Sequence, residues 1–248
     1  MTAFDTRPVA AVDFVDDPDE PVDRKAWPFT LPAVRQLADE GLDIGSVTVL
    51  VGENGSGKST LVEAIAMAYG FAPEGGSIGS RHMTRSSESG LHRALRIRRG
   101  IGAAPSGFFL RAETMHSFYS YLEANPTKAP EPTFHELSHG ESFLAVLGTR
   151  FIHPGFYVLD EPESALSFSG CLALIGTIHE LVANGAQALI ATHSPLIASI
   201  PGARILEVGD WGLREADWED LDLIRNWRTF LDAPQRYLRH VIDQSSDT

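Results

Sequence analysis

The stretch VGENGSGKST, residues 51–60, follows the apolar run VTVL and contains three glycines and a single lysine. The pattern G-x-x-x-x-G-K-[ST] is met at Gly52, Gly57, Lys58 and Ser59. Glycines let consecutive backbone N–H groups turn inward around an anion, and the N-terminus of a following helix adds its positive dipole end. SVTVLV before the loop predicts a short strand, and STLVEAIAMAYG predicts a helix that ends at Gly70. This strand–loop–helix context predicts a nucleoside triphosphate site.

Each residue type in this loop suits a phosphate group. Lys58 is expected to reach the β- and γ-phosphates, and the Ser59 hydroxyl is expected to ligate Mg²⁺. The predicted nucleotide contacts are Gly52, Glu53, Asn54, Gly55, Ser56, Gly57, Lys58, Ser59 and Thr60.

Composition restricts the class of protein. The 248 residues are 43% hydrophobic and 21% charged, as is usual for a globular chain. A net charge of -13 argues against tight, nonspecific binding of bare nucleic acid by the whole surface. The single cysteine, Cys171, permits no internal disulfide, and its apolar surroundings predict a buried thiol. No apolar run approaches the roughly 18 residues of a membrane span, and the first residues do not resemble a signal peptide. We expect a cytoplasmic protein without membrane insertion.

Strands alternate with helices after the phosphate loop, which predicts an α/β fold with a mostly parallel sheet flanked by helices. We expect one domain over residues 1–248, with its motif core at 44–195. The segment 71–112 is predicted to hold a loop and a small antiparallel β subdomain, in which LHRALRIRRG and SGFFLRAE are neighbouring strands. Segment 113–137 is predicted to be a short helical insertion. The segment 203–248 is predicted to form a hairpin and a helix that ends before Pro234.

Two predicted strands end in side chains that suit phosphate chemistry. FYVLDE ends in Asp160, a candidate Mg²⁺ ligand, and Glu161, whose carboxylate could orient or deprotonate an attacking water. QALIATHSP places His193 at a second strand end, where an imidazole can donate to a phosphate oxygen. Taken singly, such residues are often solvated strand ends or structural histidines; the phosphate loop favours the functional interpretation.

The stretch LSHGES begins another predicted helix. Ser138 and Glu141 form an S-x-x-E capping box, so an ordinary helix start accounts for the pattern. The same start offers free N–H groups, a hydroxyl and a helix dipole to an anion.

Together these motifs resemble the ATP-binding-cassette ATPases. The resemblance covers about residues 44–195 and includes, in order, GENGSGKST (Walker A), LSHGE (signature), FYVLDE (Walker B), PESAL (D-loop) and ATHSP (H-loop). It implies a P-loop fold and ATP hydrolysis with Mg²⁺ between two head-to-tail copies. It also implies that Ser138 and Gly140 cover the γ-phosphate from the opposite copy. In this family Glu161 would be the catalytic base, His193 the γ-phosphate partner, and Ser164 and Ala165 would lie where the two copies meet.

The chain departs from the family pattern at three places. His139 replaces the commoner signature glycine. The expected Q-loop glutamine is absent, and Glu113 in FFLRAET is the candidate stand-in near Mg²⁺. The aromatic residue that would stack on the base is either Trp27 or Phe29.

Three functional classes remain open from the sequence. The short stretch between Glu113 and the signature leaves little room for the subdomain that grips a membrane partner, which favours a stand-alone switch like the compact RecF/SMC-like ATPases. A transporter energy subunit is the first alternative. A nucleic-acid-linked ATPase is the second, supported by six arginines that a solvated strand face and loop also explain. They are Arg81, Arg85, Arg93, Arg96, Arg98 and Arg99.

Overall fold

The computed structural model describes residues 5–19, 21–78, 89–103, 105–114 and 139–242. Its main sheet has seven strands in the order β10–β9–β3–β8–β7–β6–β4. The five inner strands run parallel: β3 (Val47–Gly52), β6 (Gly107–Arg111), β7 (Phe156–Asp160), β8 (Gln187–Thr192) and β9 (Arg204–Gly209). The edges β4 (Gly76–Ser77) and β10 (Gly212–Glu215) are antiparallel to their neighbours. The expected P-loop α/β fold with a mostly parallel sheet is confirmed.

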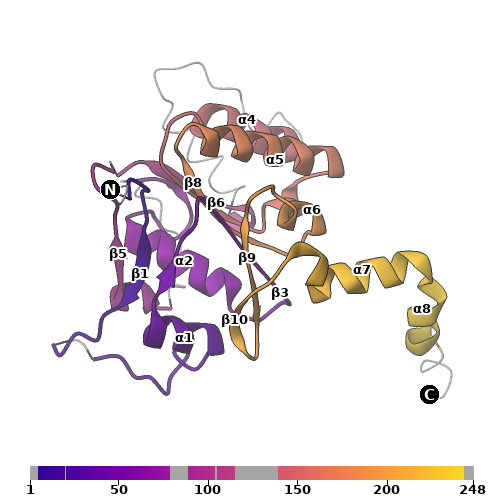
Figure 1. Cartoon of the computed structure of the whole chain (residues 1–248), viewed down its shortest axis with the longest axis horizontal. Helices are drawn as coiled ribbons and strands as arrows, with labels where there is room; N and C mark the ends of the chain where they lie inside the picture. Colours follow the sequence, from indigo (N-terminus) through magenta and orange to yellow (C-terminus); the bar gives the residue numbers. More distant parts are fainter. Residues whose placement is uncertain (1–4, 20, 79–88, 104, 115–138, 243–248) are drawn as a thin grey trace.

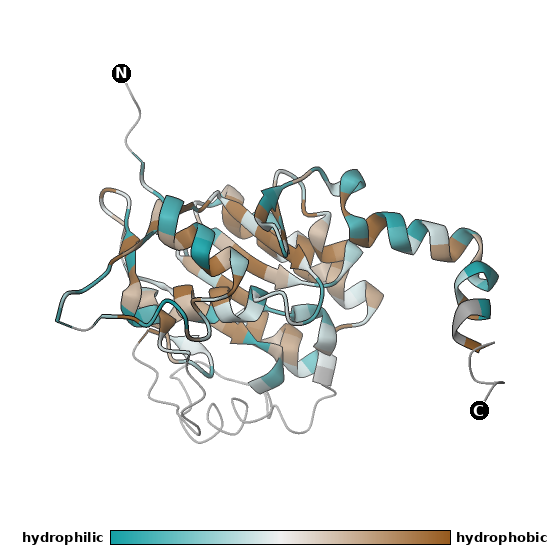
Figure 2. Ribbon diagram, turned by 90° about the horizontal axis from the view of Figure 1, so that it is seen from below, coloured by the Kyte–Doolittle hydropathy of each residue, from teal (hydrophilic) through white to brown (hydrophobic). Residues whose placement is uncertain are grey.

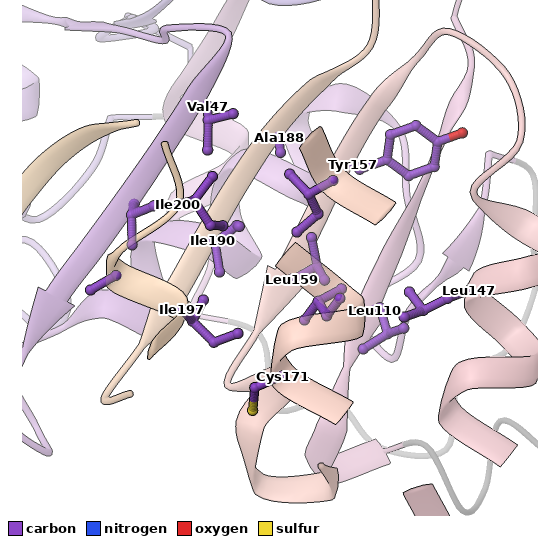
Figure 3. Close-up of a cluster of buried hydrophobic side chains, with 14 of the residues drawn as sticks. Val47, Leu110, Leu147, Tyr157, Leu159, Cys171, Ala188, Ile190, Ile197 and Ile200 are labelled. Atoms are coloured by element: carbon purple, nitrogen blue, oxygen red, sulfur yellow. The ribbon is translucent and has the colours of Figure 1, made fainter. Parts of the chain in front are cut away.

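Helices cover both faces of this sheet (Figure 1). One face packs on α1 (Pro32–Glu40) and α2 (Lys58–Tyr69), and the other on α4 (His139–Arg150), α5 (Phe168–Ala183) and α6 (Pro195–Ala198). Figure 3 shows the hydrophobic core on the face covered by α4, α5 and α6, where Leu159 and Ile190 of adjacent strands lie beneath helix side chains. Cys171 lies in this core, 4% exposed, and burial raises the pKa of its thiol. Both strand faces are therefore buried, which explains the continuous apolar runs in the sequence.

A second sheet of three antiparallel strands, β2–β1–β5, lies beside α1 and α2. It consists of β1 (Ala11–Phe14), β2 (Leu42–Asp43) and β5 (Leu95–Arg98). The small antiparallel sheet is thus confirmed, but the expected pairing of β5 with β6 is wrong. β5 pairs with β1, whereas β6 joins the main sheet beside β7. Residues 108–110 of β6 are all buried, as a central parallel strand requires, while the β5 run LRIR has exposed arginines at alternate positions.

Gln187, at the start of β8, joins the N-terminal segment to the main sheet. Its amide group is fully buried, and its Oε1 accepts a hydrogen bond from the Val9 N–H at 2.8 Å. Its Nε2 donates to the carbonyls of Val9 (2.7 Å), Gly45 (2.9 Å) and Ile44 (3.1 Å). One side chain therefore satisfies backbone groups of two loops that have no strand partner there.

The C-terminal segment continues beyond the expected hairpin of β9 and β10. The predicted helix is α7 (Asp222–Asp232), and a further helix, α8 (Pro234–Ile242), follows it. Pro234 ends one helix and begins the next, since proline fits the first position of a helix as well as a stop. Figure 2 shows both helices extending away from the body. Among the described residues no helix has the length and apolar character needed to span a membrane.

Candidate nucleotide site

The phosphate loop connects β3 to α2 through three glycines. A Cβ at Gly52 would lie 2.3 Å from the Val208 carbonyl oxygen of β9, so no larger residue fits. Gly55 and Gly57 have φ angles of +80° and +98°, which glycine adopts without the penalty that other residues have. The loop therefore turns sharply at the carboxyl end of a central strand, with its N–H groups available to an anion.

Lys58 begins α2 and is 3% exposed. Its Nζ donates to the Glu53 carbonyl oxygen at 2.9 Å, across the loop. Burial lowers the pKa of Lys58, whereas the nearby carboxylates of Glu161, Asp160 and Glu163 raise it. Ser56, Ser59 and Thr60 are half-buried around the lysine, and residues 53–55 are exposed. The loop thus places one cation where phosphate oxygens would enter.

Asp160 ends β7 and is 4% exposed. Burial raises the pKa of its carboxyl group to about 6, although Arg111 and a hydrogen bond from Ser59 lower it. Its Oδ2 lies 3.5 Å from Arg111 Nε, and its Oδ1 is buried without a hydrogen-bond partner in the described part of the chain. A buried carboxylate oxygen without a partner, next to a serine hydroxyl, fits the oxygen ligands that Mg²⁺ prefers.

Arg111 ends β6 and lies next to Asp160. It is directly opposite Asp160 in the β6–β7 pairing, and its Nη1 donates to Glu63 of α2 at 2.5 Å. Glu113, the proposed Q-loop stand-in, is 82% exposed and lies 3.7 Å from Arg111 Nη2. Arg111, rather than Glu113, is therefore the side chain placed against Asp160. Arg111 was not predicted as a site residue, although it directly follows the apolar run FFL in the sequence.

Glu161 leaves the strand in an unusual conformation. Its φ of +50° and ψ of +50° are in the left-handed region, which a non-glycine residue adopts at an energetic cost and often at functional sites. Its N–H donates to the Ala191 carbonyl oxygen at 2.9 Å, and its Oε1 lies 3.1 Å from His193 Nε2. The turn aims Glu161 at the end of β8, while Asp160 stays buried beside β6. The two adjacent carboxylates therefore have separate environments.

Glu163 connects the turn after β7 to the end of β8. Its Oε1 accepts hydrogen bonds from Thr192 Oγ1 at 2.7 Å and from the His193 N–H at 2.5 Å. The backbone of His193 is thus held by the same turn that carries Glu161. This role of Glu163 was not predicted from the PESAL motif, because its two partners lie 29 and 30 positions later in the chain.

Comparison with known proteins identifies the family of the chain. The model for the ABC transporter family matches residues 38–164. The chain belongs to this family. It is an ATP hydrolase of the ABC type, because the members of this family are ATPases.

Individual relatives of this ABC chain are mostly parts of import and export systems. A ribose import ATP-binding protein from Rhizobium meliloti is 29% identical, over 66% of this chain and 37% of that protein. A cytochrome c biogenesis ATP-binding export protein from Vibrio vulnificus is 23% identical, over 67% of this chain and 87% of that protein. The chain spans less than half the length of the sugar import relatives. Among solved structures, the SMC head domain of Thermotoga maritima has a TM-score of 0.42 at 17% identity, covering 71% of this chain and 93% of that one.

The ABC signature is described only in part. Ser138 lies outside the described residues, and α4 begins at His139. A Cβ at Gly140 would lie 3.4 Å from the Ala165 carbonyl oxygen, so the start of the signature helix faces the D-loop turn of the same chain. Ser164 in that turn is exposed, and its Oγ donates to the Glu161 carbonyl oxygen at 3.0 Å. The signature helix and the D-loop therefore lie next to each other.

A cleft of about 570 Å³ opens beside the Walker A loop. Its aromatic lining comes from Trp211 after β9 and Trp227 of α7. Of the two aromatic residues expected to stack on a base, Phe29 packs on Phe14 with ring centroids 6.2 Å apart, and Trp27 is 59% exposed. The two cleft tryptophans were not predicted as site residues, because they follow the ABC motifs in the sequence.

Some arginines of the segment 81–99 contact other residues of the ABC chain. Arg98 pairs with Asp13 at 2.7 Å, and Arg99 donates to the Tyr69 carbonyl oxygen at 3.0 Å while covering its ring. Arg93 and Arg96 are exposed, and Arg81 and Arg85 lie outside the described residues. Of the four described arginines, Arg98 and Arg99 thus have local partners, whereas Arg93 and Arg96 face solvent.

Proposed function

We propose that this chain is a cytoplasmic, ATP-driven switch in which two copies enclose Mg²⁺ and ATP, with hydrolysis separating them. The observation that carries the proposal is the 3.1 Å contact between Glu161 Oε1 and His193 Nε2, at adjoining strand ends beside Lys58. A carboxylate and an imidazole at this distance can act together: the carboxylate can accept a proton from a water molecule while the imidazole donates to a phosphate oxygen.

The roles of the residues follow from their chemistry. The loop N–H groups and the Lys58 ammonium would hold the phosphates. Glu161, half-exposed and held by its turn, would accept a proton from the attacking water. His193 would orient Glu161 and donate to the γ-phosphate.

Ser59 and Asp160 are the proposed holders of Mg²⁺, whose charge would neutralise phosphate oxygens when it is bound. The unpartnered Oδ1 of Asp160 supports this assignment. Glu113 is the third proposed ligand; its side chain is exposed and lies 3.7 Å from Arg111 Nη2. Arg111 would keep the Asp160 carboxylate oriented.

The second copy would complete the site with Ser138 and Gly140. The adjacency of Gly140 and Ala165, and the exposure of Ser164, support a common surface for the signature and the D-loop. An ATP bound by one copy would then contact the helix start of the other.

Mixing two inactive variants tests this arrangement. Lys58→Ala removes the phosphate cation, and Ser138→Asp keeps a helix cap but places a negative charge against the γ-phosphate. In a mixed dimer one site carries both changes and the other carries neither, so mixing should restore ATP turnover. Activity that stays at the sum of the two variants, with mixed dimers shown to form, would mean that each copy completes its own site.

A transporter energy subunit is the second candidate function. It is favoured by the names of the relatives, which describe a ribose importer and a cytochrome c biogenesis exporter. Co-purification of the natural chain with a membrane protein, and ATP turnover that depends on that partner, would support it over a stand-alone switch. Stimulation by DNA or RNA would instead indicate a nucleic-acid-linked ATPase.

A further inference from the structure

The cleft beside the phosphate loop extends across the carboxyl ends of three neighbouring strands. It reaches from His193 after β8, along loop residues 52–56 after β3, to Trp211 after β9. Residues of α7 and the start of α1 also line it. Its volume of about 570 Å³ is in the range of small-molecule sites, roughly 300–1,000 Å³. A ligand of the phosphate loop can therefore continue into this cleft.

The strand order gives the direction of a bound nucleotide. Ligands of parallel sheets lie at the carboxyl ends of the strands, and β3 lies between β8 and β9. The proposed partners of the γ-phosphate and the attacking water, His193 and Glu161, are on the β8 side of the loop. The phosphates would cross the loop from that side, so the nucleoside would leave over β9, where Trp211 lies.

Trp211 is held in place by three neighbours and is still half-exposed. Its Nε1 donates to the Glu207 carbonyl oxygen at 3.2 Å, and the Arg214 guanidinium lies 4.3 Å from its ring centroid. A Cβ at Gly209 would lie 2.6 Å from Trp211 Cζ2, so a larger residue would displace the ring. The side chain nevertheless remains 50% exposed. A fixed aromatic ring with an open surface suits the stacking of a base.

The wall that α7 contributes is fixed to the same strand. Glu207 of β9 is 4% exposed, and its Oε1 accepts a hydrogen bond from the N–H of Asp222, the first residue of α7, at 3.0 Å. Its other carboxylate oxygen pairs with Arg214, and Leu221 and Ile224 are buried in the main core. The cleft is therefore formed before a ligand binds, which reduces the entropic cost of binding.

The polar lining of the cleft favours a base over a phosphate. None of the described residues that line it is a lysine or an arginine, and its four carboxylates belong to Glu53, Glu207, Asp210 and Asp222. Carboxylates repel phosphates but accept hydrogen bonds from an amino group, which adenine has. Beyond the loop, the cleft is thus suited to the uncharged, planar end of ATP.

We propose that this cleft is the base subsite of the ATP site, with Trp211 as the aromatic residue on which adenine stacks. The base would then contact an element that follows the ABC motifs in the sequence, in place of Trp27 or Phe29 before them. This inference rests on the proposed positions of the phosphates at Lys58 and His193, and it does not require the second copy.

Binding of ADP and of pyrophosphate to the full chain tests the subsite. ADP has the base and two phosphates, pyrophosphate has only the phosphates, and an ATP hydrolase turns over neither. Trp211→Ala should weaken ADP binding at least about tenfold, the scale of base–aromatic stacking, and change pyrophosphate binding less than about twofold. Trp27→Ala tests the competing assignment with a tryptophan that is 59% exposed, and ADP affinity should change less than about twofold. Calorimetric titration with Mg²⁺ measures both ligands.

Trp211→Phe is a second variant that keeps an aromatic ring. It should bind ADP within about threefold of the wild type, because phenylalanine can also stack on a base. ADP should quench the tryptophan emission of the wild type, and at least about half of that quenching should be lost in Trp211→Phe. A folded Trp211→Phe protein with the full quenching would overturn the stacking on Trp211.

The other outcomes separate this subsite from the proposed function. Equal losses of ADP and pyrophosphate affinity in Trp211→Ala would overturn the base subsite, since Trp211 would then act on the phosphate loop. Unchanged ADP affinity in Trp211→Ala, or a loss confined to Trp27→Ala, would overturn it as well. Full ADP affinity in Lys58→Ala would reject the phosphate site and the base subsite with it. A chain that binds ADP through Trp211 but never dimerises with ATP would reject only the two-copy switch.

Discussion

Strand β8 begins at Gln187 and ends next to His193, and the polar groups at its two ends differ in whether they have hydrogen-bond partners. At the start, every polar atom of Gln187 has a partner, and the side chain is fully buried. At the other end lie a residue in the left-handed region, Glu161, and a buried carboxylate, Asp160, with an oxygen that has no partner. The first arrangement stabilises the fold, and the second keeps unsatisfied groups ready for a ligand.

Glu161→Gln, at the functional end of β8, should have the largest effect. The amide keeps the size of the side chain but cannot accept a proton, so kcat for ATP should fall about 10³-fold. ATP affinity should change little, since the phosphate loop is untouched. Steady-state turnover with nucleotide binding measured separately checks this, and a variant with near wild-type kcat would remove Glu161 from the role of base.

Asp160 should make the functional end sensitive to pH. Burial raises the pKa of Asp160 from 3.8 to about 6. Between these two pH values the folded chain keeps the carboxyl proton, whereas the unfolded chain loses it. As pH rises from 3.8 through 6, the free energy of unfolding without nucleotide or Mg²⁺ should fall, by up to about 3 kcal/mol. Urea unfolding at pH 4.5 and 7 should show that Asp160→Asn lacks this loss. Parallel pH profiles for the two proteins would contradict the shift.

Gln187→Leu probes the structural end. Leucine fills a similar volume, but it leaves the buried N–H and carbonyl of Val9 without the hydrogen bonds that Gln187 supplies, so the free energy of unfolding should fall by about 2 kcal/mol. ATP affinity of the folded protein should stay the same, because the phosphate loop is at the opposite end of the sheet. Denaturant titration with ATP binding checks both parts. A loss of ATP affinity larger than the loss of stability would show that the two ends are coupled.

Glu163 should have the smallest effect, because it acts through His193. Glu163→Ala removes two hydrogen bonds to the end of β8 and should lower kcat about tenfold with little change in KM. Glu163→Gln keeps an acceptor oxygen and should retain most activity. If the effect passes through the imidazole, adding Glu163→Ala to His193→Ala should cost nothing further. Additive losses in that double variant would give Glu163 a separate role.

Most of the long strands and helices could be predicted from the sequence, but not all of their neighbours in space. The strands ending at Gly52, Asp160 and Thr192 were predictable from apolar runs, and they do lie side by side. The pairing of β5 with β1 could not be predicted, because β1 lies more than 80 residues earlier in the chain and both strands are short. Helix α8 was missed because Pro234 was interpreted only as a stop.

The phosphate loop could be predicted from the amino-acid sequence alone. Gly52, Gly57, Lys58 and Ser59 are consecutive or nearly so, and the shape of such a loop depends on local backbone freedom and on the helix that follows. Three contacts are visible only in the folded chain: Arg111 faces Asp160, Glu163 accepts a hydrogen bond from the His193 N–H, and Gln187 joins β8 to Val9. These contacts connect residues from 30 to 178 positions apart, so they exist only after the sheet has assembled.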